Sequence, residues 1–275
     1  MAKIAVLQMT SGIAPEANLS AIEDAAQEAS AKGAQVLFTP EMSILLDRDR
    51  KRAASWIEGS GPGEVAERLS KTARECGIDI ALGSQPVAGE GGLWANRSMY
   101  FDRNSEGAIN PVTYDKIHMF DVELSTGETW RESKAYQAGD QVVCAENTPL
   151  GRLGLTVCYD VRFPALFEAL GQRQCDAIAV PAAFTVPTGR AHWHTLLKAR
   201  AIEAQAFVIA AAQVGKHDDG RETYGHSLVV DPWGEVLLDM GSDAPGLGFC
   251  DVDLGRIDEV RSQLPSLANK REIPI

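Results

Sequence analysis

The feature that most constrains the fold of this chain is an alternation of short apolar runs with amphipathic segments. The runs IAVL, VLF, IAV and VIAAA contain no polar position, which is typical of strands that are covered on both faces. The pattern predicts strands at 3–9, 35–41, 78–85, 97–101, 141–145, 153–158, 177–181, 207–213, 226–231, 236–239 and 248–252. Helical periodicity predicts helices at 16–32, 63–76, 164–173, 189–205 and 254–263. Such alternation indicates an α/β protein in which helices cover the faces of a sheet.

The organisation of the chain indicates one domain. Its 275 residues contain no internal repeat and no dividing linker rich in glycine, serine or proline. We therefore expect a single domain over residues 1–275. The segment 102–136 is rich in polar residues and poor in strand signal. A long segment of this kind in a compact domain is often a loop that lines a site.

Composition and charge exclude several classes of partner. The net charge of −12 argues against nucleic acid or an anionic membrane, because both attract basic surfaces. No run approaches the roughly 18 apolar residues of a membrane span, and the apolar stretch at the N-terminus is too short for a signal peptide. Five cysteines without a CxxC motif suit reduced thiols in a cytoplasmic protein and argue against a structural zinc site. His192 and His194 are two positions apart, so they cannot share one helix face as a metal pair.

One cysteine lies where a strand gives way to a helix. In GRLGLTVCYDVRFPALFEAL, residues 151–170, the run LGLTV predicts the strand, and Pro164 suits the first turn of the helix. Cys158 lies between them, where backbone N–H groups at the start of a helix favour a thiolate. A buried free cysteine is usually only a small hydrophobic residue, and this interpretation suffices for the other four cysteines. Its position makes Cys158 a candidate nucleophile.

A catalytic thiol needs a base and a group that stabilises the oxyanion. A Cys–His pair would draw on one of five histidines, and the local sequence selects none of them: His118, His192, His194, His217 and His226. Glu41, which ends the apolar run VLFTPE, and Lys116, in TYDKIHMFD, form a second candidate set with Cys158. Either charge could instead lie at a strand end and reach solvent. The separations from 41 to 116 and from 116 to 158 in the sequence leave both sets open.

Four segments together resemble the signature regions of the carbon–nitrogen hydrolase (nitrilase) superfamily. They are FTPEMS, YDKIHMFDVEL, GRLGLTVCYDVRFP and YGHSLVVDPWGEV, and they follow the order of that family over nearly the whole chain. The resemblance implies a four-layer α-β-β-α sandwich and a Glu–Lys–Cys triad, which falls on Glu41, Lys116 and Cys158. It also implies a second glutamate beside the triad, Glu132 in TWRESK, with Glu128 as the weaker candidate.

The residues after the cysteine favour the amidase branches of this superfamily. They are Tyr159 and Asp160, whereas true nitrilases typically carry Trp-Glu there. The segments PAAFTVPTGRAHWHTLLKARAIEAQ and AAAQVGKHDDGRETYGHSLVVDPWG resemble the Nit branch, whose members include amidases of deaminated glutathione and ω-amidases. The resemblance implies hydrolysis of a small carboxylate-bearing amide. Deaminated glutathione is expected first, with α-ketoglutaramate or an N-carbamoyl amino acid as alternatives.

The implied mechanism passes through a thioester and needs neither a metal nor an organic cofactor. Glu41 would accept the proton of Cys158 and later pass it to the leaving amine. Lys116 and the backbone N–H of Tyr159 would stabilise the oxyanion, and Glu132 would orient Lys116. Two rivals remain at this point. A papain-like peptidase would tolerate Glu41→Gln, and a non-catalytic binding protein of the same fold would show no special thiol reactivity.

Substrate binding and assembly complete the expectations. The residues expected to bind substrate are Tyr159, Arg162, Phe184 and Arg190. Arg162 is the first choice for a substrate carboxylate because a guanidinium binds carboxylate in a bidentate manner, and Arg190 is the second choice. The resemblance further implies a homodimer. Apolar and aromatic residues of 163–170 and 192–197 are expected to supply its contact.

Overall fold

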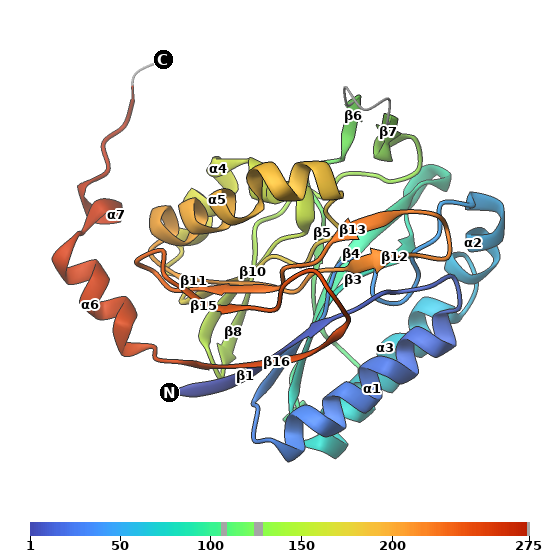
Figure 1. Ribbon diagram of the computed structural model, residues 1–275, viewed down its shortest axis with the longest axis horizontal. Coiled ribbons are helices and arrows are strands. Elements are labelled where there is room, and N and C mark those ends of the chain that lie inside the picture. The colour runs from blue at the N-terminus through green and yellow to red at the C-terminus, as the bar shows by residue number, and fades with distance from the viewer. Residues whose placement is uncertain (106–108, 124–128, 274–275) are drawn as a thin grey trace.

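The computed structural model describes residues 1–105, 109–123 and 129–273, in which two six-stranded sheets face each other between layers of helices (Figure 1). This α-β-β-α order confirms the fold class expected from the sequence. One hydrophobic cluster contains residues of both sheets, such as Val6 and Phe38 of the first sheet and Leu155 and Ile178 of the second. The organisation of residues 1–275 as one domain stays a prediction, which this shared core supports. No helix in the described ranges is long and apolar enough to cross a membrane.

The first sheet has the strand order β16-β1-β2-β3-β4-β5. Its strands are β1 Ala2–Gln8, β2 Val36–Phe38, β3 Asp79–Ala88, β4 Trp94–Phe101, β5 Val112–Asp115 and β16 Gly246–Val252. β1, β2 and β3 run parallel, and the other three pair antiparallel with their neighbours. All three residues of β2 are buried, as its uninterrupted apolar run predicts.

The second sheet has the strand order β15-β14-β11-β10-β9-β8. Its strands are β8 Val143–Thr148, β9 Gly151–Leu155, β10 Ala177–Ala179, β11 Phe207–Ala210, β14 Leu228–Val230 and β15 Val236–Asp239. β9, β10 and β11 run parallel. The antiparallel pair β14 and β15 forms a hairpin that turns at Gly234, whose φ of 91° suits glycine. Each sheet therefore has parallel strands at its centre, where burial on both faces is greatest.

Two long helices cover each sheet on its outer face. α1 (Pro15–Ala31) and α3 (Gly61–Cys76) pack on the first sheet, and α4 (Pro164–Gln172) and α5 (Val186–Ala204) pack on the second (Figure 1). Each of these helices has a proline at one of its first two positions, where the missing N–H has no intrahelical acceptor. The remaining helices are α2 (Arg50–Ile57), α6 (Gly255–Gln263) and α7 (Ser266–Asn269).

The segment 102–136 differs from the loop that the sequence predicts. It contains β5, the small hairpin of β6 (Asp121–Glu123) and β7 (Thr129–Arg131), and a 3-10 helix, Glu132–Lys134. A second unpredicted hairpin joins β12 (Val214–Lys216) and β13 (Glu222–Tyr224). These strands have three or four residues each, which is too short for a period of two to be recognised in sequence.

The apolar residues expected to join two protomers are buried within one protomer. Leu166, Phe167 and Leu170 of α4 and Trp193 and Leu197 of α5 are at most 5% exposed. They pack in the same core cluster as the second sheet. The homodimer stays a prediction, but these side chains do not provide its contact surface.

Candidate active site

Glu41 and Cys158 occupy equivalent places in the two sheets. β2 ends at Phe38 and β9 ends at Leu155, so each side chain follows the carboxyl end of a parallel strand by three residues. The carboxyl ends of parallel strands are where sites form in α/β proteins. Both turns contain a residue in the left-handed region, Met42 at φ 54° and Cys158 at φ 49°. This conformation is uncommon for residues other than glycine and persists only where the surrounding structure enforces it.

The two turns approach each other at Gly83 of β3. A Cβ atom at this position would lie 2.1 Å from the carbonyl oxygen of Thr39 and 2.4 Å from the Cβ of Pro181. Thr39 belongs to the turn that carries Glu41. The carbonyl of Pro181 accepts a hydrogen bond from the backbone N–H of Cys158 at 2.8 Å. The absence of a side chain at Gly83 therefore allows the base and the thiol to lie close together.

Glu41 is 5% exposed, and protein donors surround its carboxylate. Its Oε1 accepts hydrogen bonds from Lys116 Nζ and Asn96 Nδ2, both at 3.0 Å. Its Oε2 accepts from the backbone N–H of Ala183 at 3.0 Å. Gln213 Nε2 donates to the backbone carbonyl of Glu41 at 3.0 Å, which fixes the turn itself. The carboxylate is thus held in one orientation.

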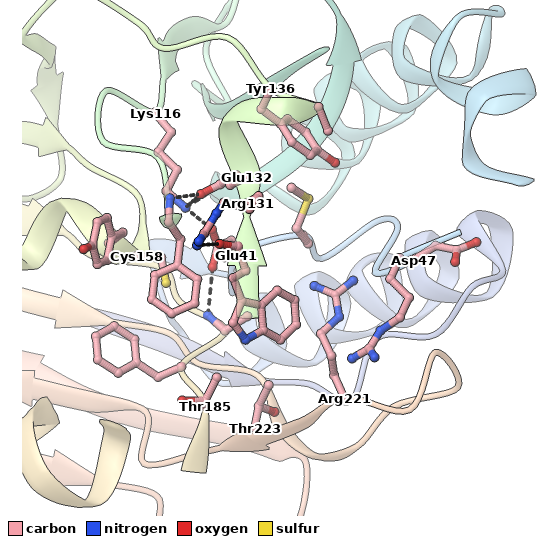
Figure 2. A pocket seen from close by; sticks show the side chains of 18 of the residues that line it. Glu41, Asp47, Lys116, Arg131, Glu132, Tyr136, Cys158, Thr185, Arg221 and Thr223 are labelled. Atoms are coloured by element: carbon pink, nitrogen blue, oxygen red, sulfur yellow. Dashed lines mark hydrogen bonds and ion pairs between the residues drawn. The ribbon is translucent and has the colours of Figure 1, made fainter. Parts of the chain in front are cut away.

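Lys116 is 2% exposed and lies between two carboxylates (Figure 2). Its Nζ donates to Glu41 at 3.0 Å and to the two oxygens of Glu132 at 3.0 and 2.9 Å. Glu132 also accepts from the backbone N–H of Phe120 at 2.6 Å. The alternative in which Glu41 and Lys116 reach solvent is therefore wrong. Glu128, the weaker candidate for the second glutamate, lies outside the described residues.

The electrostatics of this group decide the resting state of the thiol. Burial by itself would lower the pKa of Lys116, but the charges of Glu132 and Glu41 outweigh it and hold that pKa well above its usual value. Burial raises the pKa of the Cys158 thiol well above its usual value, and the charge of Glu41 raises it further against the opposing effect of Lys116. The expectation that a helix start stabilises a thiolate here is wrong, because the helix is only the five-residue 3-10 helix Cys158–Arg162 and burial dominates. A thiol whose pKa is raised in this way needs a base to become a nucleophile.

A buried carboxylate that the sequence analysis did not assign fixes the cysteine turn. Asp160 Oδ2 accepts from the Val157 N–H at 2.8 Å and from the Tyr114 hydroxyl at 2.7 Å. Its Oδ1 accepts from the backbone N–H of His118 at 3.1 Å and lies 2.8 Å from His118 Nδ1. Tyr114 and His118 flank Lys116 in the sequence. Asp160 therefore ties the segment that carries the ammonium to the turn that carries the thiol.

Glu41, Lys116, Glu132 and Cys158 form the floor of a cavity of about 680 Å³. This volume is in the usual range for sites that bind small molecules. Aromatic side chains line it, including Tyr159 and Phe184, as the sequence analysis expected, together with Phe120 and Trp130. Tyr159 contacts Phe120 edge to face, with ring centroids 5.0 Å apart. The cavity can therefore hold a small organic amide against the thiol.

Five arginines line the same cavity, and we call them the arginine wall: Arg48, Arg50, Arg131, Arg162 and Arg221. The sequence analysis assigned only one of them. Arg48 and Arg221 both face Asp219, with N···O distances of 3.9 and 2.6 Å, and Arg131 pairs with Glu123 at 3.6 Å. Figure 2 shows Arg221 and Arg131 beside the floor residues. The five arginines come from loops and from the ends of short elements that are far apart in the sequence, so no local sequence pattern predicts the wall.

The two arginines proposed from the sequence have different positions. Arg162 lines the cavity and forms no ion pair with any carboxylate in the described part of the chain. Its guanidinium lies 5.1 Å from the ring centre of Phe184 and 5.8 Å from that of Tyr159, and its Nη1 is 3.3 Å from His192 Nδ1. Arg190 is exposed on the first turns of α5 and does not line the cavity. The assignment of Arg190 to substrate binding is therefore wrong for this protomer.

None of the five histidines, all of which are described, lines the cavity. His118 stacks on Phe163, with ring centroids 3.6 Å apart, and is bonded to Asp160. His217 is buried and bonded to Ser11 and Thr223. A papain-like Cys–His pair therefore has no support, and the carboxylate of Glu41 is the base that the geometry offers.

Comparison with known proteins agrees with this arrangement. Residues 3–262 match the family profile described as carbon–nitrogen hydrolase. The chain is 40% identical to the deaminated glutathione amidase of Yersinia enterocolitica, over 98% of this chain and 93% of that protein. It is 38% identical to the human deaminated glutathione amidase, over 98% of this chain and 82% of that protein. The chain belongs to the carbon–nitrogen hydrolase family. Within that family it is an amidase.

Solved structures confirm the fold. The crystal structure of the Caenorhabditis elegans NitFhit protein matches with a TM-score of 0.89 and 34% identity, over 98% of this chain and 66% of that chain. A mutant of the amidase from Nesterenkonia sp. AN1 matches with a TM-score of 0.78 and 27% identity, over 97% of this chain and 99% of that chain. That structure shows the result of Michael addition of acrylamide at its active-site cysteine.

Proposed function

We propose that this amidase hydrolyses deaminated glutathione through a thioester on Cys158. The observation that carries the proposal is the full-length similarity to deaminated glutathione amidases, at 40% and 38% identity. The cavity supports it, because a substrate with carboxylates at both ends suits a site whose floor is an amide-cleaving triad and whose wall is rich in arginine. The steps below assign each residue its part.

The first step is attack on the amide carbonyl. Cys158 Sγ forms a bond to the carbonyl carbon while Glu41 accepts the thiol proton, and the carbonyl electron pair moves to the oxygen. The ammonium of Lys116 has three N–H donors, one facing Glu41 and two facing the oxygens of Glu132, so the oxyanion takes over one of the two donors that now reach Glu132. The backbone N–H of Tyr159, for which the described residues supply no acceptor, provides a second.

The second and third steps use the same base. The oxyanion collapses, the C–N bond breaks, and Glu41 passes its proton to the leaving amine, which leaves a thioester on Cys158. Water then gives a proton to Glu41 and attacks the thioester. Expulsion of the thiolate, which regains the proton, releases the carboxylic acid and restores the resting site. Lys116 stays charged throughout, because the carboxylate of Glu132 raises its pKa even while Glu41 holds a proton.

Arg162 is the candidate for binding the carboxylate of the α-keto acid. It follows Cys158 in the 3-10 helix Cys158–Arg162, so it is positioned by the same turn as the nucleophile. Three of the other wall arginines, Arg48, Arg131 and Arg221, already face carboxylates of the protein.

A comparison of two substrates tests the proposal. Deaminated glutathione and α-ketoglutaramate would place the same acyl group on Cys158 and differ only in the leaving group, a dipeptide in one and ammonia in the other. A ratio of kcat/KM values therefore reports recognition of the leaving group alone. We expect deaminated glutathione to be favoured at least about tenfold, the gain from one additional charged hydrogen bond. A preference for α-ketoglutaramate or for an N-carbamoyl amino acid would overturn the proposed substrate.

A further inference from the structure

Three potential metal ligands meet on the outer side of the second sheet, away from the cavity. His194 lies on α5, His226 precedes β14, and Asp239 ends β15 (Figure 1 shows α5 and β15). His194 Nε2 is 3.0 Å from Asp239 Oδ2, and His226 Nδ1 is 2.9 Å from Asp239 Oδ1. One ligand atom from each residue lies within 4.8 Å of the others. None of the three residues lines the cavity.

The surrounding structure holds His226 and Asp239 in place. His226 has a φ of 54°, and its ring stacks on Tyr224 with centroids 4.5 Å apart. Its backbone N–H donates to the carbonyl of Gly241 at 2.7 Å, and its carbonyl accepts from Trp193 Nε1 at 2.8 Å. The N–H of Gly241 in turn donates to Asp239 Oδ1 at 2.9 Å. Both residues are therefore oriented by bonds from outside the cluster.

We propose that His194, His226 and Asp239 bind one divalent transition-metal ion, for which Zn²⁺ is the best match. Two imidazole nitrogens and one carboxylate are a common ligand set for zinc, with water as the fourth ligand. Tetrahedral zinc with bonds of 2.0–2.1 Å places its ligand atoms about 3.4 Å apart, which small side-chain rotations can reach from the present positions. The ion would take the place of the two ring protons that now point at Asp239.

The position of the cluster gives the ion a structural effect. His194 is in the helix that covers the second sheet, while His226 and Asp239 flank and end the β14–β15 hairpin. An ion held by all three would cross-link α5 to that hairpin. The side chains of His194, His226 and Asp239 are 36%, 21% and 34% exposed, so the ion could exchange with solvent. The cluster is compatible with the expectation that His192 and His194 form no metal pair, because His192 is not among its three residues.

Metal titration of the whole protein tests the proposal. We expect isothermal titration with Zn²⁺ to show one equivalent bound, and the same equivalent to raise the unfolding temperature. Co²⁺ bound at this site should show visible bands without the intense near-ultraviolet charge-transfer band of thiolate ligation. This distinction matters because Cys144 Sγ and Cys175 Sγ lie 3.2 Å apart and could also bind a soft metal ion.

Variants distinguish Zn²⁺ binding at the cluster from Zn²⁺ binding elsewhere in the protein. Asp239→Asn, His194→Gln and His226→Asn should each weaken Zn²⁺ binding at least about tenfold, since even changes outside the ligand set usually cost that much. Asparagine is chosen at position 226 because it tolerates a positive φ. His192→Gln, two residues from His194 on the same helix, should bind Zn²⁺ as the unchanged protein does. No bound equivalent, a thiolate band with Co²⁺, or equal affinity in the Asp239→Asn variant would overturn the proposal.

Discussion

The floor of the cavity and its arginine wall differ in how deeply their side chains are buried and in how firmly they are held. On the floor, Glu41 and Lys116 are at most 5% exposed and are bonded to each other and to backbone or side-chain donors and acceptors. On the wall, the side chains of Arg48 and Arg131 are 53% and 40% exposed, and they lie in a loop and at the end of β7. A floor fixed before substrate arrives stabilises the transition state without rearrangement. The exposed wall can change to suit a substrate without disturbing the chemistry.

The largest effect should follow a change in the floor that keeps its shape. Glu41→Gln can still accept hydrogen bonds at its amide oxygen, but it cannot take the thiol proton. We expect kcat to fall roughly 10²–10⁴-fold, the usual contribution of a general base, while the far-ultraviolet circular dichroism stays unchanged. Initial rates of amine release would measure the loss. Glu75→Gln, an exposed change on α3, serves as the control. Near-normal turnover of Glu41→Gln would remove the base assignment.

The second prediction concerns the carboxylate that supports the floor. Asp160→Asn replaces one accepting oxygen by a donor at a side chain that is fully buried and accepts from Val157, Tyr114 and His118. We expect the free energy of unfolding in urea to fall by about 3 kcal/mol, because a buried network would be broken rather than removed. Tyr114→Phe, which deletes one hydroxyl of the same network, should cost only about 1 kcal/mol. Equal losses from the two variants would contradict this account of Asp160.

The contrast between floor and wall also explains what the sequence could predict. Glu41 and Cys158 follow apolar strands whose burial the uninterrupted runs indicate, so their places at strand ends were predictable. Resemblance to a family, rather than spacing, then selected Lys116 and Glu132. Asn96 and Asp160 were missed because their partners are far apart in sequence and meet only through the fold. Nothing local distinguishes these polar residues from exposed ones.

The wall was less predictable for a related reason. Arg48 and Arg221 reach the cavity from loops in different halves of the chain and meet only at Asp219. The short β6–β7 hairpin that carries Arg131 has too few residues to show periodicity. Arg190 was chosen by its neighbourhood in sequence, but the helical turn directs it to solvent. The positions of these arginines around the cavity could therefore not be predicted from the sequence.

The third prediction tests whether the wall selects substrate. Arg162→Met keeps most of the side-chain volume near Phe184 and Tyr159 but removes the charge. For an anionic amide we expect kcat/KM to fall roughly 30-fold. This corresponds to about 2 kcal/mol of lost transition-state stabilisation, as for the loss of one charged hydrogen bond. A neutral amide of similar size should lose much less. Arg48→Met, at a side chain that is 53% exposed and faces Asp219, should change either value less than Arg162→Met does. Equal losses on both substrates would make Arg162 a structural residue.

The smallest expected effect separates the floor thiol from a thiol outside the site. A hydrogen bond with Cys175 lowers the pKa of Cys144 to about 7 against the opposing effect of burial, whereas burial raises the pKa of Cys158 well above 9.0. Near neutral pH Cys144 is therefore ionised to a much larger extent than Cys158. Since the thiolate is the reactive form, iodoacetamide should label Cys144 about tenfold faster than Cys158, as followed by peptide mass spectrometry, so labelling of the resting thiol does not separate an enzyme from a binding protein as the sequence analysis expected.

The pH dependence of this labelling shows whether the charge of Glu41 raises or lowers the pKa of Cys158. Labelling of Cys144 should rise through about pH 7, and labelling of Cys158 should rise only at higher pH, because burial and the charge of Glu41 raise its pKa. Glu41→Gln removes a negative charge that raises the pKa of Cys158 and leaves the ammonium of Lys116, which lowers it. The Cys158 profile should therefore shift to lower pH in this variant while that of Cys144 stays in place. Thiol reactivity would then increase as amide turnover is lost, which shows that the base serves the proton transfers rather than the ionisation of the resting thiol. A Cys158 profile that does not move would contradict this.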